Sequence, residues 1–167
     1  MTKSSGHVPV LLQEVIRYIN CASGKNIIDA TLNGGGHSRA LIEHCPGVKI
    51  LGIEFDPVLA AQFTRAHPEM ASRLTVVNDS YAHLKEIVQQ HAFTPDGILF
   101  DLGLSSWHYE SSGRGFSFQK DEQLDMRFNP EQQTLTAVQI VNTYSREQLS
   151  QILKSFGEEQ FAEEIAT

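Results

Sequence analysis

The chain has 167 residues, of which 41% are hydrophobic and 20% are charged, and it contains 12 glycines and 6 prolines. This composition excludes a disordered, collagen-like or low-complexity chain and predicts a single globular core. The formal net charge of −7 excludes a chain-wide basic surface for a nucleic-acid backbone, so any contact with RNA has to be local.

The two cysteines, Cys21 and Cys45, are too few for a disulfide scaffold and lack the paired spacing of a zinc site. We therefore expect reduced thiols and no bound metal. No apolar stretch is long enough to cross a membrane, and the first residues lack the apolar run of a secretion signal. These features predict a cytoplasmic protein without a membrane partner.

The first expected element is an amphipathic helix over residues 9–20, where apolar residues recur at helical spacing. Strands and helices then alternate, with Asp56 and Pro57 suited to the N-cap and first position of one helix. Such alternation predicts right-handed crossovers and a parallel sheet covered on both faces, an α/β fold with three layers. The expected strands are 26–30, 49–53, 74–77 and 97–100, and the expected helices between them are 38–44, 57–65 and 83–90.

The alternation lapses between residue 102 and about residue 130, where glycine, serine, aromatic residues and isolated charges predict a functional loop. Two helices are expected after it, over 134–141 and 149–156. Ser145 and Gln148 form a capping-box pattern that opens the second of them, and Gly157 fits its end. Residues 161–167 again read as helix.

Three consecutive glycines, Gly34, Gly35 and Gly36, follow the first expected strand and precede His37. In a parallel sheet this turn lies at the carboxyl edge, where glycine lets the backbone approach a ligand and the next helix offers unpaired N–H groups. Glu54 follows the second strand about 20 residues later, where a carboxylate can accept both ribose hydroxyls of a nucleoside. Together these features favour a nucleotide-like ligand over a bare connection.

The residues around the glycines discriminate between ligands. A phosphate-binding P-loop requires a lysine that is absent here, and Arg39 stands where the dinucleotide fingerprint has its last Gly or Ala. S-adenosylmethionine needs only a glycine turn, an acid and an apolar wall, all of which this sequence provides. A nucleotide-dependent oxidoreductase remains the alternative. Tyr81, after the third strand, could line an adenine pocket or simply start a helix.

Asp101 follows the fourth strand and is the leading catalytic candidate, with a helix cap or a ribose contact as the alternative. His108 could be a polar contact, a base or a solvated side chain. Arg114, Phe116 and Phe118 combine a cation with aromatic rings in a glycine-containing segment, which suits stacking on an unpaired base. Phe116 and Phe118 could also be ordinary core residues.

Six motifs follow one another as in the bacterial small-subunit ribosomal RNA cytosine-N4 methyltransferases, which this sequence resembles from residue 7 onward. They are HVPVLL (7–12), DATLNGGGHS (29–38), DGILFDLGLSS (96–106), RGFSF (114–118), LDMR (124–127) and FGEE (156–159). The resemblance implies a class I, Rossmann-like, S-adenosylmethionine-dependent enzyme. Its expected reaction is methylation of the exocyclic N4 amine of a cytidine in the decoding region of small-subunit ribosomal RNA.

The resemblance, together with the loop residues considered above, gives the full set of predicted catalytic, cofactor-binding and substrate-binding residues. Glu54 and Tyr81 stand where the family usually has Asp and Phe, and Trp107 with His108 stands where it has Pro and Gln. Asp101 is the predicted catalytic residue. The predicted cofactor-binding residues are Gly34, Gly35, Gly36, His37, Glu54, Tyr81, Asp101 and His108. The predicted substrate-binding residues are Ser105, Ser106, Arg114, Phe116 and Phe118.

Family members continue for a comparable distance beyond residue 167, so the chain resembles an amino-terminal portion. Residues 1–104 would form the cofactor-binding part with four parallel strands, and residues 105–167 the substrate-recognition loop and the beginning of an inserted helical domain. We expect this portion alone to be inactive and to self-associate through the apolar edge at 97–100. A non-catalytic fragment that binds the cofactor or the ribosome is a further alternative.

Overall fold

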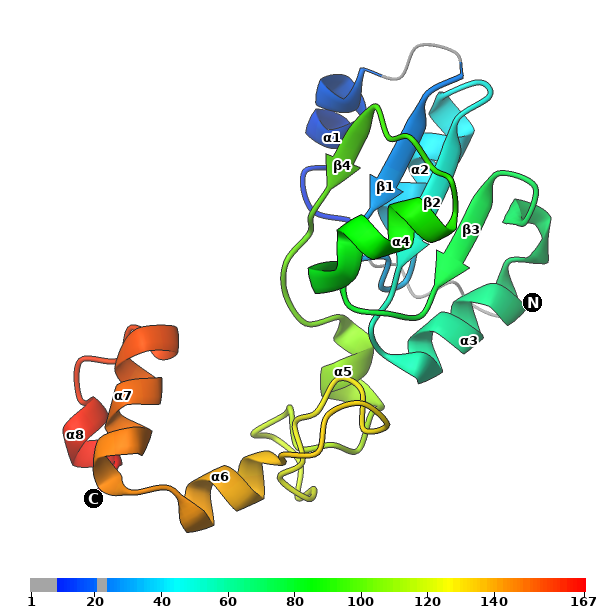
Figure 1. Cartoon of the computed structure of the whole chain (residues 1–167). Coiled ribbons are helices and arrows are strands. Elements are labelled where there is room, and N and C mark those ends of the chain that lie inside the picture. The colour runs from blue at the N-terminus through cyan, green and yellow to red at the C-terminus, as the bar shows by residue number, and fades with distance from the viewer. Residues whose placement is uncertain (1–8, 21–23) are drawn as a thin grey trace. The chain divides into compact units, whose positions relative to one another are not determined.

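The computed structural model describes residues 9–20 and 24–167 (Figure 1). The chain divides into two compact units, Met1–Gly103 and Leu104–Thr167, and each is described by itself. Within the described residues, no helix combines the length and the apolar character that crossing a membrane requires.

The first unit is built on a parallel sheet with the strand order β3-β2-β1-β4. The α/β prediction is therefore confirmed, and the first strand lies between the second and the fourth. The strands are β1 (Asn26–Asp29), β2 (Lys49–Ile53), β3 (Leu74–Val77) and β4 (Gly97–Leu99). The helices are α1 (Leu12–Ile19), α2 (Gly36–His44), α3 (Pro57–Ala66) and α4 (Leu84–Gln90), with the 3-10 turns η1 (Pro68–Met70) and η2 (Tyr81–His83).

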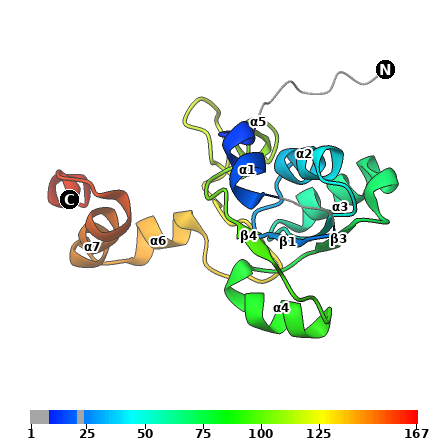
Figure 2. The ribbon, with the colours of Figure 1, turned by 90° about the horizontal axis from the view of Figure 1, so that it is seen from above.

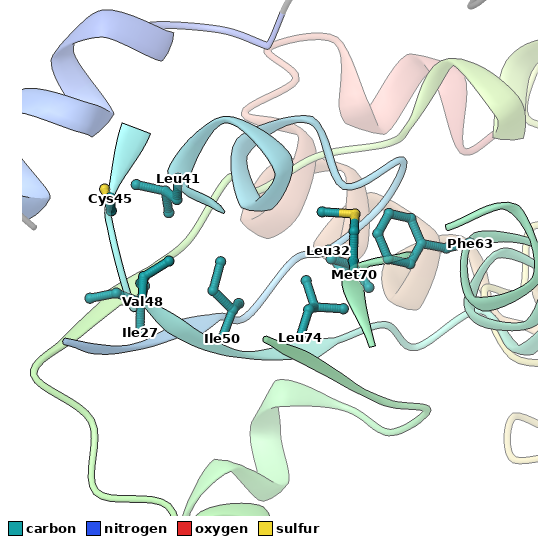
Figure 3. Close-up of a cluster of buried hydrophobic side chains, with 9 residues drawn as sticks. All are labelled: Ile27, Leu32, Leu41, Cys45, Val48, Ile50, Phe63, Met70 and Leu74. Carbon is teal, nitrogen blue, oxygen red and sulfur yellow. The ribbon is translucent and has the colours of Figure 1, made fainter. Parts of the chain in front are cut away.

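Helices cover both faces of this sheet, with α1, α2 and α3 on one side and α4 on the other (Figure 2). The strands are short and apolar on both faces, which is typical of a sheet that is buried between two helical layers. The core beneath α2 and α3 consists of Ile27, Leu32, Leu41, Cys45, Val48, Ile50, Phe63, Met70 and Leu74 (Figure 3). The core on the α4 side consists of Ile28, Ala30, Leu51, Ile53 and Ile87.

Local signals explain how some of these helices begin. The Asp56 carboxylate accepts from the backbone N–H of Val58 at 2.8 Å and Pro57 occupies the first turn of α3, as predicted. The opening helix, however, begins at Leu12 and not at Pro9. Leu11 takes a left-handed conformation with φ of 50°, which separates the preceding segment from α1.

The second unit contains α5 (Ser106–Glu110), α6 (Ala137–Thr143), α7 (Arg146–Gly157) and α8 (Ala162–Ile165), and residues 111–136 have no regular helix or strand. The predicted capping box of α7 is present, since the Gln148 N–H donates to the Ser145 hydroxyl and the Gln148 side chain accepts from the Ser145 N–H. Helix α7 ends at Gly157, as predicted, and the left-handed residue that follows it is Glu158, with φ of 51°. The short helix α5 was not predicted.

The expectation of reduced thiols is wrong for Cys45. This residue is buried and is disulfide-bonded in the structure. The other cysteine, Cys21, lies outside the described residues. The low number of cysteines was therefore an insufficient reason to expect free thiols.

Candidate functional site

The turn after β1 is fixed to the sheet by backbone hydrogen bonds. The N–H of buried Leu32 donates to the Ile53 carbonyl at the end of β2 at 2.9 Å, and the N–H of Gly35 donates to the Leu32 carbonyl at 2.7 Å. Leu32 thus anchors the turn through both its side chain and its backbone. This holds Gly34 and Gly35 at the carboxyl edge of the sheet, which is the edge where parallel α/β sheets bind ligands.

The three glycines have different surroundings. A Cβ at Gly35 would lie 2.0 Å from the Phe63 ring, and Gly35 has a left-handed φ of 69°. A Cβ at Gly36 would lie 2.4 Å from the Pro9 ring, whereas a Cβ at Gly34 would meet no atom within 4 Å. Packing therefore explains Gly35 and Gly36, and only Gly34 faces open space.

The carboxylate of Glu54 links this turn to the start of α3. Its Oε2 accepts from the N–H of Asn33 and its Oε1 accepts from the N–H of Asp56, both at 2.8 Å. The residue is 5% exposed. The Asn78 amide donates to the Glu54 carbonyl at 2.8 Å and so fixes the backbone from the other side. Glu54 lies at the predicted edge, with its carboxylate already bound by the turn.

A buried carboxylate, Asp29, ends β1 directly below the turn. The Ser38 hydroxyl donates to it at 2.6 Å, and the N–H of Thr31 donates to it at 3.3 Å. Burial raises the pKa of Asp29, and these two hydrogen bonds oppose the shift only in part. The sequence analysis did not single out this residue, although an acid at the end of a buried strand is a recognisable signal.

Asp101 is joined to the same turn. Its backbone N–H donates to the Thr31 hydroxyl at 2.7 Å, and its carboxylate Oδ2 lies 3.7 Å from Nδ1 of His37. The Asp101 side chain is 37% exposed, whereas that of His37 is 7% exposed. The second ring nitrogen of His37, Nε2, lies 2.9 Å from the Val10 carbonyl. The structure therefore brings together the catalytic candidate, a buried imidazole and the segment before α1.

Tyr81 stands at the start of η2 and is half-exposed. Its ring meets that of Phe100, the residue after β4, in an edge-to-face contact with 5.7 Å between the centroids. Because Phe100 precedes Asp101, this aromatic pair lies beside the residues of the glycine turn. It provides the partly exposed apolar surface that an adenine ring would require.

The second unit carries the remaining predicted residues. His108 is fully buried, and its ring packs against those of Phe116 and Phe128 with centroid distances of 5.2 and 4.8 Å. Its Nδ1 lies 2.9 Å from the Ser105 hydroxyl at the start of α5. Ser106 is the exposed first residue of that helix. In this unit His108 and Phe116 form an aromatic core, which favours structural roles for both.

Arg114 organises the irregular segment around this core. Its guanidinium donates to the carbonyls of Arg127 and Phe128 at 3.1 and 2.9 Å and lies over the Trp107 ring. Arg127 in turn forms a two-pronged pair with Asp125, at 2.8 and 2.6 Å, and this guanidinium holds the pKa of the Asp125 carboxyl below its ordinary value. In the sequence, both arginines were marked by the motifs that contain them, RGFSF (114–118) for Arg114 and LDMR (124–127) for Arg127.

Phe118 behaves differently from its neighbour Phe116. It lies in a turn and is 98% exposed, although it is a large apolar residue. The nearby Lys120 ammonium donates to the Glu110 carbonyl and ties the turn back to α5. Of the two phenylalanines considered for base stacking, Phe118 alone presents its ring to solvent.

Known proteins match the chain over nearly its whole length. Ribosomal RNA small subunit methyltransferase H of Dehalococcoides mccartyi is 43% identical over 162 residues, which are 96% of this chain and 46% of that protein. The protein of the same name from Thermotoga neapolitana is 36% identical over 96% of this chain and 54% of its own length. The chain thus spans about half the length of these relatives.

Solved structures match less well. TrmN from Thermus thermophilus shares 18% identity over 47% of this chain and 24% of its own, with a TM-score of 0.41, which carries no argument about function. The sequence model of the MraW methylase family matches residues 4–167. Since that match includes the glycine turn, Glu54, Asp101 and the whole second unit, the chain belongs to the MraW methylase family.

Proposed function

We propose that this chain is part of an enzyme that transfers a methyl group from S-adenosylmethionine to the N4 amine of a cytidine in small-subunit ribosomal RNA. The strongest support is the match, along 162 residues, to relatives named ribosomal RNA small subunit methyltransferase H. The methyl donor and the methyl-accepting atom are the more specific parts of the proposal, and the residues at the sheet edge and the six motifs support them.

The residues of the first unit fit S-adenosylmethionine better than a nucleoside phosphate. The open space at Gly34 admits the methionine part, Tyr81 with Phe100 offers an apolar wall for adenine, and Glu54 is the acid for the ribose hydroxyls. No lysine follows the glycines to neutralise a phosphate. The molecule that these groups would hold is therefore a nucleoside with a small zwitterionic tail.

When bound, S-adenosylmethionine supplies a methyl group whose bond to sulfur breaks as a bond to the attacking nitrogen forms. The cytosine amine is a weak nucleophile because its lone pair is delocalised into the ring, so the protein has to align it and accept its proton. Asp101 is the partly exposed carboxylate at this edge, and we assign it the role of accepting the proton from the amine. Alignment alone can contribute about 7–11 kcal/mol to catalysis.

An exposed aromatic ring suits stacking on an unpaired base better than contact with a duplex. Phe118 provides that ring in the second unit. We therefore assign Phe118 to stacking on an unpaired nucleotide of the substrate, and Arg114, Phe116 and His108 to holding the segment that carries it.

Two measurements test this function. Calorimetry should show that S-adenosylhomocysteine binds the chain and that NADH does not, and the opposite result would favour an oxidoreductase. The protein as its gene encodes it should then convert cytidine in small-subunit ribosomal RNA to N4-methylcytidine, identified by nucleoside mass spectrometry against standards. A product that elutes as C5-methylcytidine would refute the assignment of the acceptor atom.

A further inference from the structure

The second unit contains a cavity of about 310 Å³ between α7 and the short helix α8, which packs against α7. All the residues that line this cavity are polar or charged. They are Arg146, Glu147, Ser150, Gln151 and Lys154 of α7 and Glu163 of α8. Such a cavity suits a small polar ligand and not a nucleobase, which needs an aromatic or apolar surface for stacking.

A buried serine forms part of the cavity wall. Ser150 is 7% exposed, and no hydrogen bond within the described part of the chain involves its hydroxyl. Buried polar groups are nearly always hydrogen-bonded, because their removal from water is otherwise unfavourable. Since Ser150 lines the cavity, its hydroxyl is available to a group that enters this space.

Two cations lie on the same side of α7 as this serine. Arg146 is four residues before Ser150 and Lys154 is four residues after it, so the three side chains form one row along the helix. At about 1.5 Å of rise per residue, each cation starts about 6 Å along the helix axis from Ser150, a distance that both long side chains can span. This Arg146–Ser150–Lys154 row faces the cavity.

The two cations of the row converge on one residue. The Lys154 ammonium donates to Oε1 of Glu163 at 2.6 Å, and the Arg146 guanidinium donates to the Glu163 carbonyl at 3.3 Å. The Lys154 ammonium also holds the pKa of the Glu163 carboxyl below its ordinary value. The chain itself thus supplies an oxyanion to the cations of the cavity.

This carboxylate can be exchanged for another oxyanion. The side chains of Lys154 and Glu163 are 48% and 63% exposed, and ion pairs with such exposure contribute little stability. Helix α8 keeps a separate anchor, because Ala162 is fully buried. When Glu163 turns outward, two cations and one carboxylate, that of Glu147, remain around the serine. The local charge then favours an anion.

We propose that this cavity binds a phosphate group, which displaces the Glu163 carboxylate and accepts hydrogen bonds from the three side chains of the row. A phosphate has enough oxygen atoms to accept from a guanidinium, a hydroxyl and an ammonium at once, whereas a carboxylate has only two. The phosphate can belong to a free phosphate compound or to the backbone of RNA. Only the second source rests on the proposed function.

Titration of the 167-residue chain with inorganic phosphate at constant ionic strength tests the site. Proton–nitrogen NMR spectra should show saturable shifts that are largest for the α7 amides around Ser150. Ser150→Ala should weaken phosphate binding by about 3- to 10-fold without lowering the free energy of unfolding, since the lost hydroxyl makes no hydrogen bond in the free protein. Shifts that do not saturate, or a Ser150→Ala protein with unchanged phosphate affinity, would overturn the inference.

Two further variants break the same ion pair and should have opposite effects. Lys154→Gln removes a charged donor and should weaken phosphate binding by about 10-fold or more. Glu163→Gln removes the competing carboxylate and should strengthen binding by about two- to fivefold. Lys85→Gln, which removes the same charge from α4 of the first unit, should leave the affinity unchanged. Changes in the same direction for the first two variants, or an equal loss in Lys85→Gln, would contradict a specific site.

A short single-stranded RNA and its analogue with an uncharged methylphosphonate backbone distinguish the two sources of the phosphate. If the RNA backbone is the source, only the charged RNA should shift the same α7 amides, and inorganic phosphate should compete with it. If inorganic phosphate alone shifts them, the source is a free phosphate compound. If neither does, the inference fails. Binding of S-adenosylhomocysteine is measured separately, so a failure of the proposed function is recognised independently of this site.

Discussion

Valine substitutions at Gly34 and Gly35 should separate ligand binding from folding, although the two residues are adjacent. A side chain at Gly34 would enter open space, whereas a side chain at Gly35 would meet the Phe63 ring. We expect Gly34→Val to abolish binding of S-adenosylhomocysteine in a stable protein. We expect Gly35→Val to destabilise the protein itself.

The magnitude for Gly35→Val follows from two costs. A side chain in the left-handed region costs about 1–2 kcal/mol, and a β-branched one fits it poorly. The new Cβ would also start 2.0 Å from the ring of Phe63, which is buried in the core beneath α3 and would have to shift within that core. Overpacking of a core adds about 1–3 kcal/mol. The free energy of unfolding should therefore fall by about 2–5 kcal/mol.

Gly34→Val incurs neither cost, so its free energy of unfolding should stay within about 0.5 kcal/mol of the wild-type value. Urea denaturation measures both stabilities, and calorimetry with S-adenosylhomocysteine measures the affinity of each folded variant. Unchanged affinity in a folded Gly34→Val protein would remove this turn from the site. An unchanged unfolding free energy in Gly35→Val would show that Phe63 yields, which would refute the packing argument.

Three further predictions concern other parts of the chain. Phe118→Ala should leave the unfolding free energy unchanged and weaken binding of single-stranded RNA, whereas the control Phe116→Ala should cost about 3–5 kcal/mol; equal stabilities of the two variants would contradict this. Burial raises the pKa of Asp29 in the folded protein above 3.8, so the folded protein keeps this proton to a higher pH than the unfolded chain does. The free energy of unfolding should therefore fall as the pH rises from the unfolded-state pKa through the folded-state pKa. Denaturation at a series of pH values should show this fall relative to Asp29→Asn, and parallel curves would refute it. Sedimentation should detect self-association through β4, whose Ile98 is half-exposed, and Ile98→Lys should suppress it; a monomeric wild-type chain would refute the edge argument.

Much of the first unit could be predicted because its signals are local. The apolar runs at 49–53 and 74–77 became strands with those bounds, and Asp56 with Pro57 began α3 as expected. At the start of α1, where the prediction was wrong, a distant contact decided the outcome. Pro9 has the properties of a first-turn residue, but it packs against Gly36, which lies 27 residues away in the chain, so α1 begins later.

The candidate site shows the same division. Sheet topology brings the glycine turn, Glu54 and Asp101 to one edge, and the sequence pattern predicts that topology. The sequence could not show that the Glu54 carboxylate binds the turn, since its donors are backbone N–H groups of Asn33 and Asp56. Nor could it separate buried Phe116 from exposed Phe118, because two aromatic residues two positions apart in an irregular segment have no period that assigns a face.

The strand order also determines when the sheet can be completed during synthesis. β1 lies between β2 and β4, and the Asn26 N–H at its start donates to the carboxylate of Asp96, 70 residues later in the chain. At about 5–20 residues per second, a ribosome needs roughly 4–14 s to add those residues. During that interval one edge of β1 has no neighbouring strand, and the apolar side chains at that edge are open to misfolding and aggregation. Early formation of β1, α2 and β2, which are consecutive in the chain, would limit that exposure to the single edge that β4 later covers.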